Sequence, residues 1–450
     1  MSAPTTQTDT IHLVFGASGY IGSNLVPYLL SSGRRVRAVS RNREVLEGRG
    51  WSGVEIAQAD AMEPLTLDAA LDRVDVAYYL VHSMAAGKNF PELDAVAARN
   101  FAAAAERQGV LRIVYLGGLL PDSPPESPHL RSRQETGDLL RAGSVPVTEI
   151  RAGMIVGPGS AAWEVIRDLV NHLPVMITPR WVKSKSTPIA LSNLLHYLAE
   201  VPAFEKTANE IYAVGGPDIL TYLEIMRQYG ELVGKRPYIL QVPLLTPRLS
   251  SYWLRLVTTV PTSIARALID GLSEDLIASD TRLVELIPQP LLGFRDAARA
   301  ALTADRQHEV PARWTEGSIA CRNFHPEYSF YARQTGDVFL TTARASDVWD
   351  VICTVGNNGD FFYARWLWWA RRALDWLIGG PSLRRKRRHP QRLRVGDVVD
   401  SWRVIAMEPG TRLTLLMEMK APGAGVAEYT VHNDDQGVRI EVRAYFHPQG

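Results

Sequence analysis

The sequence predicts an α/β fold, a doubly wound parallel sheet, followed by a smaller α+β domain built on antiparallel strands. Short apolar runs alternate with helical segments up to residue 116, a glycine-rich turn follows the first run, and alternating strands take over beyond residue 328. Alternation at this pace requires right-handed crossovers between parallel strands. Since 450 residues exceed a typical single core, two or three domains are expected.

The elements of the first half follow from apolar runs and the glycines that end them. Residues 11–15 form an apolar run that ends at a glycine, as a buried parallel strand does. A helix is expected over residues 21–30, closed by Gly33. Further strands are expected at residues 35–40, 54–57, 74–81 and 113–116, and further helices at residues 67–71 and 93–108, the latter closed by Gly109. Residues 1–10 are expected to be a disordered tail without signal-peptide features.

The composition excludes several classes of protein. A net charge of +1 gives no global attraction to nucleic acid or anionic lipid. Two cysteines, Cys321 and Cys353, cannot form a disulfide framework or a four-cysteine metal site, so a cytoplasmic location is expected. The sequence has no apolar stretch of about 18 residues, and it has no metal-ligand spacing.

The turn at residues 16–22 spaces three glycines as Gly-x-x-Gly-x-x-Gly between the first strand and its helix. Such glycines let the backbone approach a pyrophosphate, which sits on the helix N-terminus. Glycines also serve ordinary tight turns, but the strand–turn–helix context favours a dinucleotide site. The residues expected to contact the cofactor here are Gly16, Ser18, Gly19, Tyr20, Ile21 and Gly22.

The end of the second strand favours NADP(H) over NAD(H). An acidic residue usually holds the ribose 2′-hydroxyl at this point, whereas arginine suits a 2′-phosphate. Here Arg41, Asn42 and Arg43 follow the strand and no acid does. The alternative is a solvated strand end. Asp60 and Ala61, after the third strand, are expected to meet the adenine, although Asp60 is equally suited to cap a helix.

Together with residues 151–159 and 214–217, these features resemble the extended or atypical short-chain dehydrogenases/reductases. Residues 78–84 and 128–133 resemble, more specifically, a bacterial group in which an NAD(P)H-binding domain is fused to a C-terminal DUF2867 domain. The resemblance covers nearly the whole chain. It implies a Rossmann fold and cofactor contacts from Leu80, Val81 and His82.

The catalytic segment departs from that superfamily. Its Tyr-x-x-x-Lys pair is matched here by His129 and Arg133, and the serine of the fifth strand is replaced by Gly117 and Gly118. Histidine can donate a proton near neutral pH. Arginine can bond ribose hydroxyls, as Arg133 is expected to do, but it takes no part in proton transfer. Either His129 is the acid or the site does no redox chemistry, and a structural histidine remains the alternative.

The Rossmann domain is expected over residues 11–305, with a substrate-facing part at its C-terminal end. Two proline-punctuated, amphipathic segments, 243–254 and 264–272, can form an apolar lid or plain core packing. The second domain is expected over residues 313–450. Its strands are expected at 329–333, 338–342, 400–405, 412–419, 427–431 and 439–446, with a helical part opening at 345–351. This order suggests a START-like helix-grip fold, in agreement with the resemblance, ending before the usual long terminal helix.

Residues 361–378 interleave tryptophan with arginine on a predicted amphipathic helix. Its inward apolar face is expected to hold Trp366, Leu367, Ala370, Leu374 and Leu377, and its outward face Arg365, Trp368, Trp369, Arg372 and Trp376. A basic run follows: Arg384, Arg385, Lys386, Arg387, Arg388, His389, Arg392 and Arg394. This pattern is typical of an interfacial anchor on anionic lipid, but packing against the Rossmann domain explains it too. Nucleic acid is not expected as a partner.

The resulting prediction is an NADPH-dependent oxidoreductase that acts on an apolar carbonyl or quinone-like substrate bound or presented by the C-terminal domain. The alternative is a redox-inert NADP(H)-binding sensor or lipophilic-ligand-binding protein. Peripheral contact with the inner face of an anionic membrane stays open, and the sequence leaves the oligomeric state undetermined.

Overall fold

The computed structural model divides the chain into two compact units, residues 1–314 and 315–450. The described residues are 10–82, 89–125, 127–178, 180–241, 274–314, 327–356, 365–377, 387–419, 423–434 and 437–448. The tail 1–9, the expected lid segments 243–254 and 264–272, Cys321, and the basic residues 384–386 lie outside these ranges.

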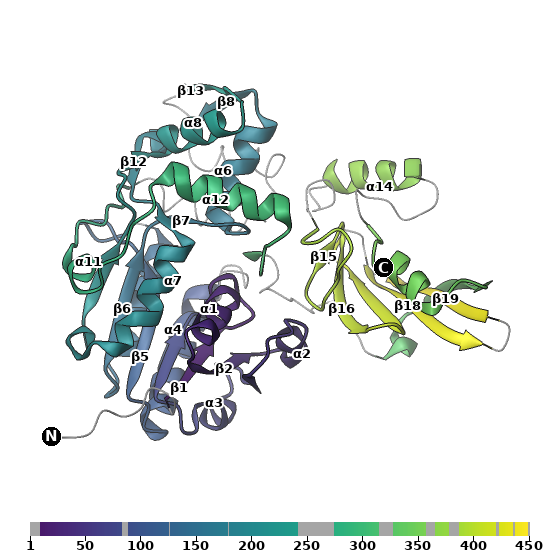
Figure 1. The fold of residues 1–450 in the computed structure, drawn as a ribbon, viewed down its shortest axis with the longest axis horizontal. Coiled ribbons are helices and arrows are strands. Elements are labelled where there is room, and N and C mark those ends of the chain that lie inside the picture. The colour runs from purple at the N-terminus through teal and green to yellow at the C-terminus, as the bar shows by residue number, and fades with distance from the viewer. Residues whose placement is uncertain are drawn as a thin grey trace. The chain divides into compact units, whose positions relative to one another are not determined.

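The first unit is built on a seven-stranded sheet in the order β11-β6-β5-β4-β1-β2-β3 (Figure 1). Every pair of neighbours in it is parallel. The strands are β1 (Ile11–Phe15), β2 (Arg35–Ser40), β3 (Val54–Gln58), β4 (Val76–Tyr79), β5 (Arg112–Gly118), β6 (Val147–Ala152) and β11 (Ile211–Val214). The strand order reverses at β1, because β2 and β3 follow on one side of it and β4, β5 and β6 on the other. The doubly wound parallel sheet predicted from the sequence is confirmed.

Helices cover both faces of this sheet. Leu25 and Leu29 of one helix and Leu194 and Leu198 of another share a core with Val14 of β1. On the opposite face, three helices contribute to a core centred on Phe101. The first face carries α1 (Tyr20–Ser31) and α7 (Leu191–Glu200), the second α3 (Pro64–Leu71), α4 (Phe90–Arg107) and α5 (Pro128–Arg141), and α2 (Arg43–Glu47) connects β2 to β3.

A smaller helical layer of the first unit packs around Trp163, whose ring lies 5.2 Å from that of Tyr229 and 6.4 Å from that of Phe294. Its helices are α6 (Ala161–His172), α8 (Tyr222–Leu232) and α12 (Phe294–Gln307), whereas Leu283 of α11 (Arg282–Leu286) joins the core of the first face. Short two-stranded pairs join them: β7 (Ile155–Val156) with β10 (Ile189–Ala190), β8 (Val175–Thr178) with β13 (Tyr238–Gln241), and β9 (Lys185–Ser186) with β12 (Leu220–Thr221).

The second unit is an antiparallel sheet in the order β14-β19-β18-β17-β16-β15. Its elements are β14 (Arg333–Thr341), α13 (Ala345–Ile352), α14 (Arg365–Leu377), β15 (Val398–Val399), β16 (Trp402–Glu408), β17 (Arg412–Met417), β18 (Gly423–Asp434) and β19 (Gly437–Pro448). Trp349 and Ile352 of α13 share a core with Val404 and Leu415 of the sheet. The predicted antiparallel sheet is therefore present.

The prediction of a strand at residues 329–333 is wrong. Tyr328–Phe330 is a turn of 3-10 helix, and β14 begins only at Arg333. The reason is aromatic stacking against the neighbouring strand. The ring of Tyr328 lies 4.6 Å from that of Tyr445, and the ring of Phe330 lies 4.3 Å from that of His447. These side chains pack on β19 instead of extending the ladder beside it.

The two faces of α14 agree with the prediction only in part, since Trp369, expected to face outward, is indeed exposed. Trp366, Leu367 and Leu374, expected to face inward, are exposed. Trp368, expected to face outward, is half-buried, and the guanidinium of Arg371 lies 5.3 Å from its ring centroid. Arg371 also pairs with Asp400 and donates 2.7 Å to Ser401 Oγ. Because polar anchors on the sheet hold Arg371, the helix turns its most apolar side outward.

The described part of the basic run is bound within its own domain. Arg387 donates to the carbonyl oxygens of Cys353 and Val355. Arg388 pairs with Asp397, which is buried. These two cations therefore hold the second unit together. No helix among the described residues is long and apolar enough to cross a membrane.

Candidate functional site

The glycine turn joins β1 to α1 and is anchored on β2. The amides of Gly16 and Ala17 both donate to the carbonyl oxygen of Val39, each over 3.0 Å. Gly16 has a φ of +91°, which favours glycine. Gly19 is the N-cap of α1, and no side chain caps that helix. The first turn of α1 can therefore offer its amides to an anion.

Gly22 permits close packing of α1 on the turn. A Cβ at Gly22 would lie 2.4 Å from the oxygen of Gly16 and 2.7 Å from the Cα of Ala17, so no larger residue fits. Ile21 and Ser18 are half-buried beside it. The turn and the helix therefore form one compact cradle, as a backbone-bound pyrophosphate requires.

At the end of β2, the three candidate residues differ in how they are used. Arg41 is exposed. The Asn42 side chain caps α2 by accepting from the amide of Glu44 at 3.0 Å. Arg43 pairs with Glu47 at 2.7 Å and donates 3.0 Å to the carbonyl oxygen of Ile56 on β3. Of the two arginines predicted for a 2′-phosphate, Arg43 is thus directed toward β3.

Asp60 follows β3 and is half-buried. Its carboxylate accepts from the amide of Met62 at 2.9 Å, so it shapes its own turn ahead of α3. Ala61 is buried, and its carbonyl oxygen accepts 2.8 Å from the side-chain amide of Asn100 on α4. The structure therefore gives both residues a structural use in this loop.

The end of β4 lies against the glycine turn because β4 is the neighbour of β1. Leu80 donates its amide to the oxygen of Phe15 over 3.0 Å. A Cβ at Gly16 would lie 3.1 Å from both the Leu80 oxygen and a methyl of Val81. Leu80 and Val81 thus share one edge of the sheet with the turn. His82 follows them, and part of its surface is exposed.

His129 and Arg133 lie one helical turn apart on α5, so they share a face. The pKa of His129 is lowered to about 3 by burial and then by the charge of Arg133. Packing around its ring and then the charges of Arg133 and His129 lower the pKa of His82 as well. The structure thus brings His82, His129 and Arg133 together from two elements. Both histidines are neutral at pH 7.

Tyr115, which the sequence did not single out, positions Arg133. Its hydroxyl, buried on β5, donates 3.0 Å to the carbonyl oxygen of Arg133. Further along the same strand, Gly117 packs against Glu149, while a Cβ at Gly118 would meet none of the described residues within 4 Å. Among the described residues, none fills the space at Gly118.

A buried carboxylate fixes α5 on the sheet. Glu149 on β6 accepts from Arg141 of α5 and, over 2.7 Å, from Arg151. A Cβ on Gly137 would lie 2.6 Å from the Glu149 oxygen, so the helix needs glycine there. The sequence did not predict this contact, because Arg141 lies on α5 and Glu149 lies on β6, and only the fold brings the two elements together.

Comparisons with known proteins agree with this geometry. Residues 16–165 match the family described as NAD(P)H-binding, and residues 335–450 match the family described as protein of unknown function DUF2867. The chain joins an NAD(P)H-binding domain to a DUF2867 domain. Within the NAD(P)H-binding domain, the uncapped α1 and the cradle that a Cβ on Gly22 would fill suit the pyrophosphate of that cofactor.

Two curated relatives are reductases. Ceramide reductase of Caulobacter vibrioides is 25% identical over 236 residues, which make up 51% of this chain and 73% of that protein. The chloroplastic divinyl chlorophyllide a 8-vinyl-reductase of Cucumis sativus is 24% identical over 254 residues, 52% of this chain and 60% of that protein. The chain thus spans less than two thirds of the plant relative.

Solved structures share the fold. The NADPH-dependent quinone oxidoreductase of Escherichia coli, complexed with NADPH, superposes with a TM-score of 0.54 at 20% identity, covering 64% of this chain and 98% of that one. Triphenylmethane reductase of Citrobacter gives a TM-score of 0.55 at 21% identity, covering 65% of this chain and 99% of that one. The NAD(P)H-binding domain therefore has the Rossmann fold of these proteins.

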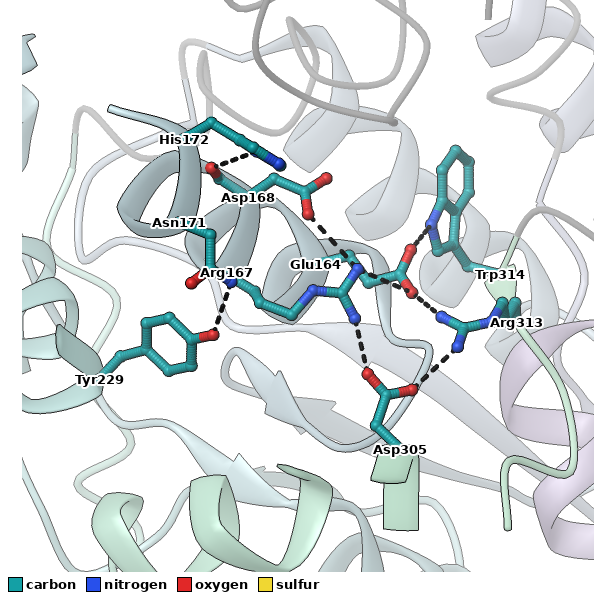
Figure 2. A network of polar contacts seen from close by, with 9 residues as sticks. All are labelled: Glu164, Arg167, Asp168, Asn171, His172, Tyr229, Asp305, Arg313 and Trp314. Atoms are coloured by element: carbon teal, nitrogen blue, oxygen red, sulfur yellow. Dashed lines mark hydrogen bonds and ion pairs between the residues drawn. The ribbon is translucent and has the colours of Figure 1, made fainter. Parts of the chain in front are cut away.

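A buried ionic network lies beside the cofactor turn (Figure 2). Glu164 on α6 pairs with Arg313 and accepts 3.0 Å from the indole of Trp314. Asp305 on α12 bonds both Arg313, at 2.8 Å, and Arg167, at 2.9 Å. The sequence placed residue 313 at the start of the second domain, but Arg313 and Trp314 close the first unit.

Tyr20, at the start of α1, lies near this network without bonding to it. Its hydroxyl is buried without a hydrogen-bond partner in the described structure, and a Cβ at Gly157 would lie 2.6 Å from it. Burial and then the charge of Glu164 raise the pKa of Tyr20. Tyr20 was predicted as a cofactor contact. Its side chain points instead toward α6, so only its backbone is directed to the cofactor cradle.

Proposed function

We propose that this chain is an NADPH-dependent oxidoreductase that reduces an apolar carbonyl or quinone-like substrate, and that the DUF2867 domain binds or presents the ligand. The observation that carries the proposal is the pair of His129 and Arg133 on one face of α5. The charge of Arg133 also lowers the pKa of His82, after burial of that ring. The pair of His129 and Arg133 stands where the resemblance places a Tyr-x-x-x-Lys pair.

The proposed roles follow from charge. NADPH, when bound, supplies a hydride to an electrophilic carbon, and negative charge then develops on the substrate oxygen. The cationic guanidinium of Arg133 stabilises that oxygen. His129, neutral because its pKa is about 3, donates an N–H hydrogen bond to the same oxygen. Its predicted role as acid requires a pKa raised by bound substrate. Otherwise water supplies the proton.

The space at the end of β5 supports a bulky substrate. None of the described residues lies within 4 Å of a Cβ placed on Gly118. The names of the relatives agree in kind, since ceramide, divinyl chlorophyllide, quinones and triphenylmethane dyes are large and largely apolar. A conjugated acceptor of this class takes hydride without a strong enzymic acid, which suits two neutral histidines.

A START-like helix-grip fold is the proposed architecture of the DUF2867 domain. In its support, β14 pairs with the last strand, β19, and both helices are inserted between β14 and β15. Val338, Phe339 and Leu340 of β14 are exposed. These apolar side chains support binding of a lipophilic ligand.

Peripheral contact with an anionic membrane is the proposed use of α14. Trp366 is 71% exposed, Trp369 63% and Leu374 62%, which is far more apolar area than a solvated helix needs to show. The sequence that follows α14, from residue 384 to residue 394, is rich in arginine. A cytoplasmic location stays a prediction.

The alternative, a redox-inert NADP(H)-binding sensor, is favoured by one observation. The pKa of His129 and that of His82 are both lowered, so neither is an imidazolium acid at neutral pH. Such a protein would bind NADPH and lipophilic ligand without turnover.

The test is NADPH consumption, followed by its absorbance, with a panel of quinones, lipophilic aldehydes and enones. Arg133→Met should abolish turnover, whereas Arg131→Met, on the exposed side of the same helix, should not. Mass spectrometry of a nonpolar extract of the purified protein identifies the ligand class. Tight NADPH binding with no turnover on any substrate would instead establish the sensor.

A further inference from the structure

Arg49 is a cation at the glycine turn that the sequence pattern does not single out. It follows α2 and is half-buried. Its guanidinium donates 3.3 Å to the carbonyl oxygen of Ser18 in the turn and 3.1 Å to the carbonyl oxygen of Pro311. One arginine thus joins the cofactor turn to the segment that closes the first unit.

The position of Arg49 differs from that of Arg43 in a way that matters for the cofactor. In a Rossmann domain, the adenosine ribose lies between the glycine turn and the end of β2. Arg49 contacts the turn itself at Ser18. Arg43 is directed the other way, toward Ile56 of β3 and Glu47. Arg41 stands at the end of β2.

We propose that Arg49 is a specificity-determining residue that, together with Arg41, holds the 2′-phosphate of NADPH. This inference rests on the proposed use of NADPH. It assigns to Arg49 the role that the sequence pattern gives to Arg43. Bonds from a guanidinium to phosphate are charge-assisted and about twice as strong as bonds to a neutral carbonyl. Because a guanidinium has five N–H donors, Arg49 can bond the phosphate while the carbonyl oxygen of Pro311 continues to orient it.

The segment 311–314 holds Arg49 ready for this role. Arg313 is tied to Glu164 and Asp305, and the amide of Trp314 donates 3.0 Å to the oxygen of Gly159. Pro311 is therefore fixed, and so is the carbonyl that orients the Arg49 guanidinium. Such preorganisation reduces the entropy lost when the phosphate binds.

The experiment is calorimetric binding of NADPH, NADH, adenosine 2′,5′-bisphosphate and AMP to the whole chain. Arg49→Gln should weaken NADPH and the bisphosphate at least tenfold and change NADH and AMP less than twofold. Arg43→Gln is the matched control, close in sequence and exposed, and should leave all four within twofold. Arg49→Lys, which keeps the charge, should recover part of the loss and remains informative if Arg49→Gln does not fold.

The outcomes separate the inference from the proposed function. If the wild-type protein binds NADH as tightly as NADPH, the use of NADPH fails and this inference fails with it. If the wild type prefers NADPH and Arg49→Gln keeps that preference, Arg49 has no such role and the proposed function stands. An equal loss for AMP and the bisphosphate would show damage to the turn and would overturn the assignment to the phosphate.

Discussion

The indole Nε1 of Trp314 donates a 3.0 Å hydrogen bond to Oε2 of Glu164, which lies 150 positions earlier in the chain. Glu164 is 3% exposed, and its other oxygen pairs with Arg313 (Figure 2). The bond ties the end of the first unit to α6, beside the helix that bears the cofactor turn.

This network predicts unequal costs for its members. Among the ion pairs of the described residues, three acids, Glu164, Asp168 and Asp305, face two bases, Arg167 and Arg313. Glu164→Gln removes the surplus charge and should cost about 1–3 kcal/mol for weakened bonds. Arg313→Met leaves buried acids uncompensated and should cost about 3–5 kcal/mol. Urea unfolding of the first unit measures both. The reverse order would contradict the charge argument.

Strands β1 to β5 could be predicted from the sequence because each is a short, largely apolar run with a glycine or polar residue near its end. Strands β6 and β11 were not predicted, and β6 carries Thr148, Glu149 and Arg151 among its apolar residues. The glycine cradle was predictable because Gly16, Gly19 and Gly22 lie within one turn. The faces of α14 could not be predicted in this way, because Arg371 is held by Asp400 and only the fold brings those two residues together. The sequence also could not predict that Arg49 contacts the glycine turn, because Ser18 and Pro311, which it bonds, are distant in sequence.

Arg41 provides the first test of cofactor choice. We expect the wild-type protein to bind NADPH more tightly than NADH, because a guanidinium bond to phosphate contributes roughly 1.5–3 kcal/mol, about tenfold or more in affinity. Arg41→Ala should lose most of this preference. Dissociation constants from protein fluorescence give the ratio. An unchanged ratio in the variant would remove Arg41 from the phosphate site.

His129 should support turnover without controlling cofactor affinity. Removing a hydrogen-bond donor to a developing oxyanion costs roughly a hundredfold or more in turnover. His129→Ala should show that loss, while its dissociation constant for NADPH stays within twofold. Steady-state rates and binding titrations on one preparation separate the two effects. Unchanged turnover would return His129 to a structural role.

The pH profile distinguishes a neutral His129 from an acid. Its pKa is lowered from 6.5 to about 3 by burial and then by Arg133, so the native state keeps it neutral where the unfolded chain is protonated. Its contribution to stability is complete above pH 6.5 and is lost as the pH falls toward 3. Turnover should therefore show no His129 inflection between pH 5 and 8. An inflection near 6.5 that vanishes in His129→Ala would favour the acid.

The last prediction concerns α14 and anionic lipid. The exposed Trp366 and Trp369 should supply apolar burial that resists salt, because apolar transfer does not depend on ionic screening. Arg384, Arg385 and Lys386 should each add on the order of 1 kcal/mol, which salt screens. Flotation with anionic liposomes should then show binding that weakens, but persists, at high salt.

The variants follow from where the side chains lie. Replacing Trp366 and Trp369 with alanine should abolish the binding that survives high salt, whereas Leu65→Ser, an exposed apolar change on α3, should not. Neutralising residues 384–386 should remove the salt-sensitive share. Arg387 and Arg388 are left intact because they bond Cys353 and Asp397, so changing them would confuse lipid binding with folding. If the wild-type protein floats with neither anionic nor neutral liposomes, the apolar face of α14 serves something other than a membrane.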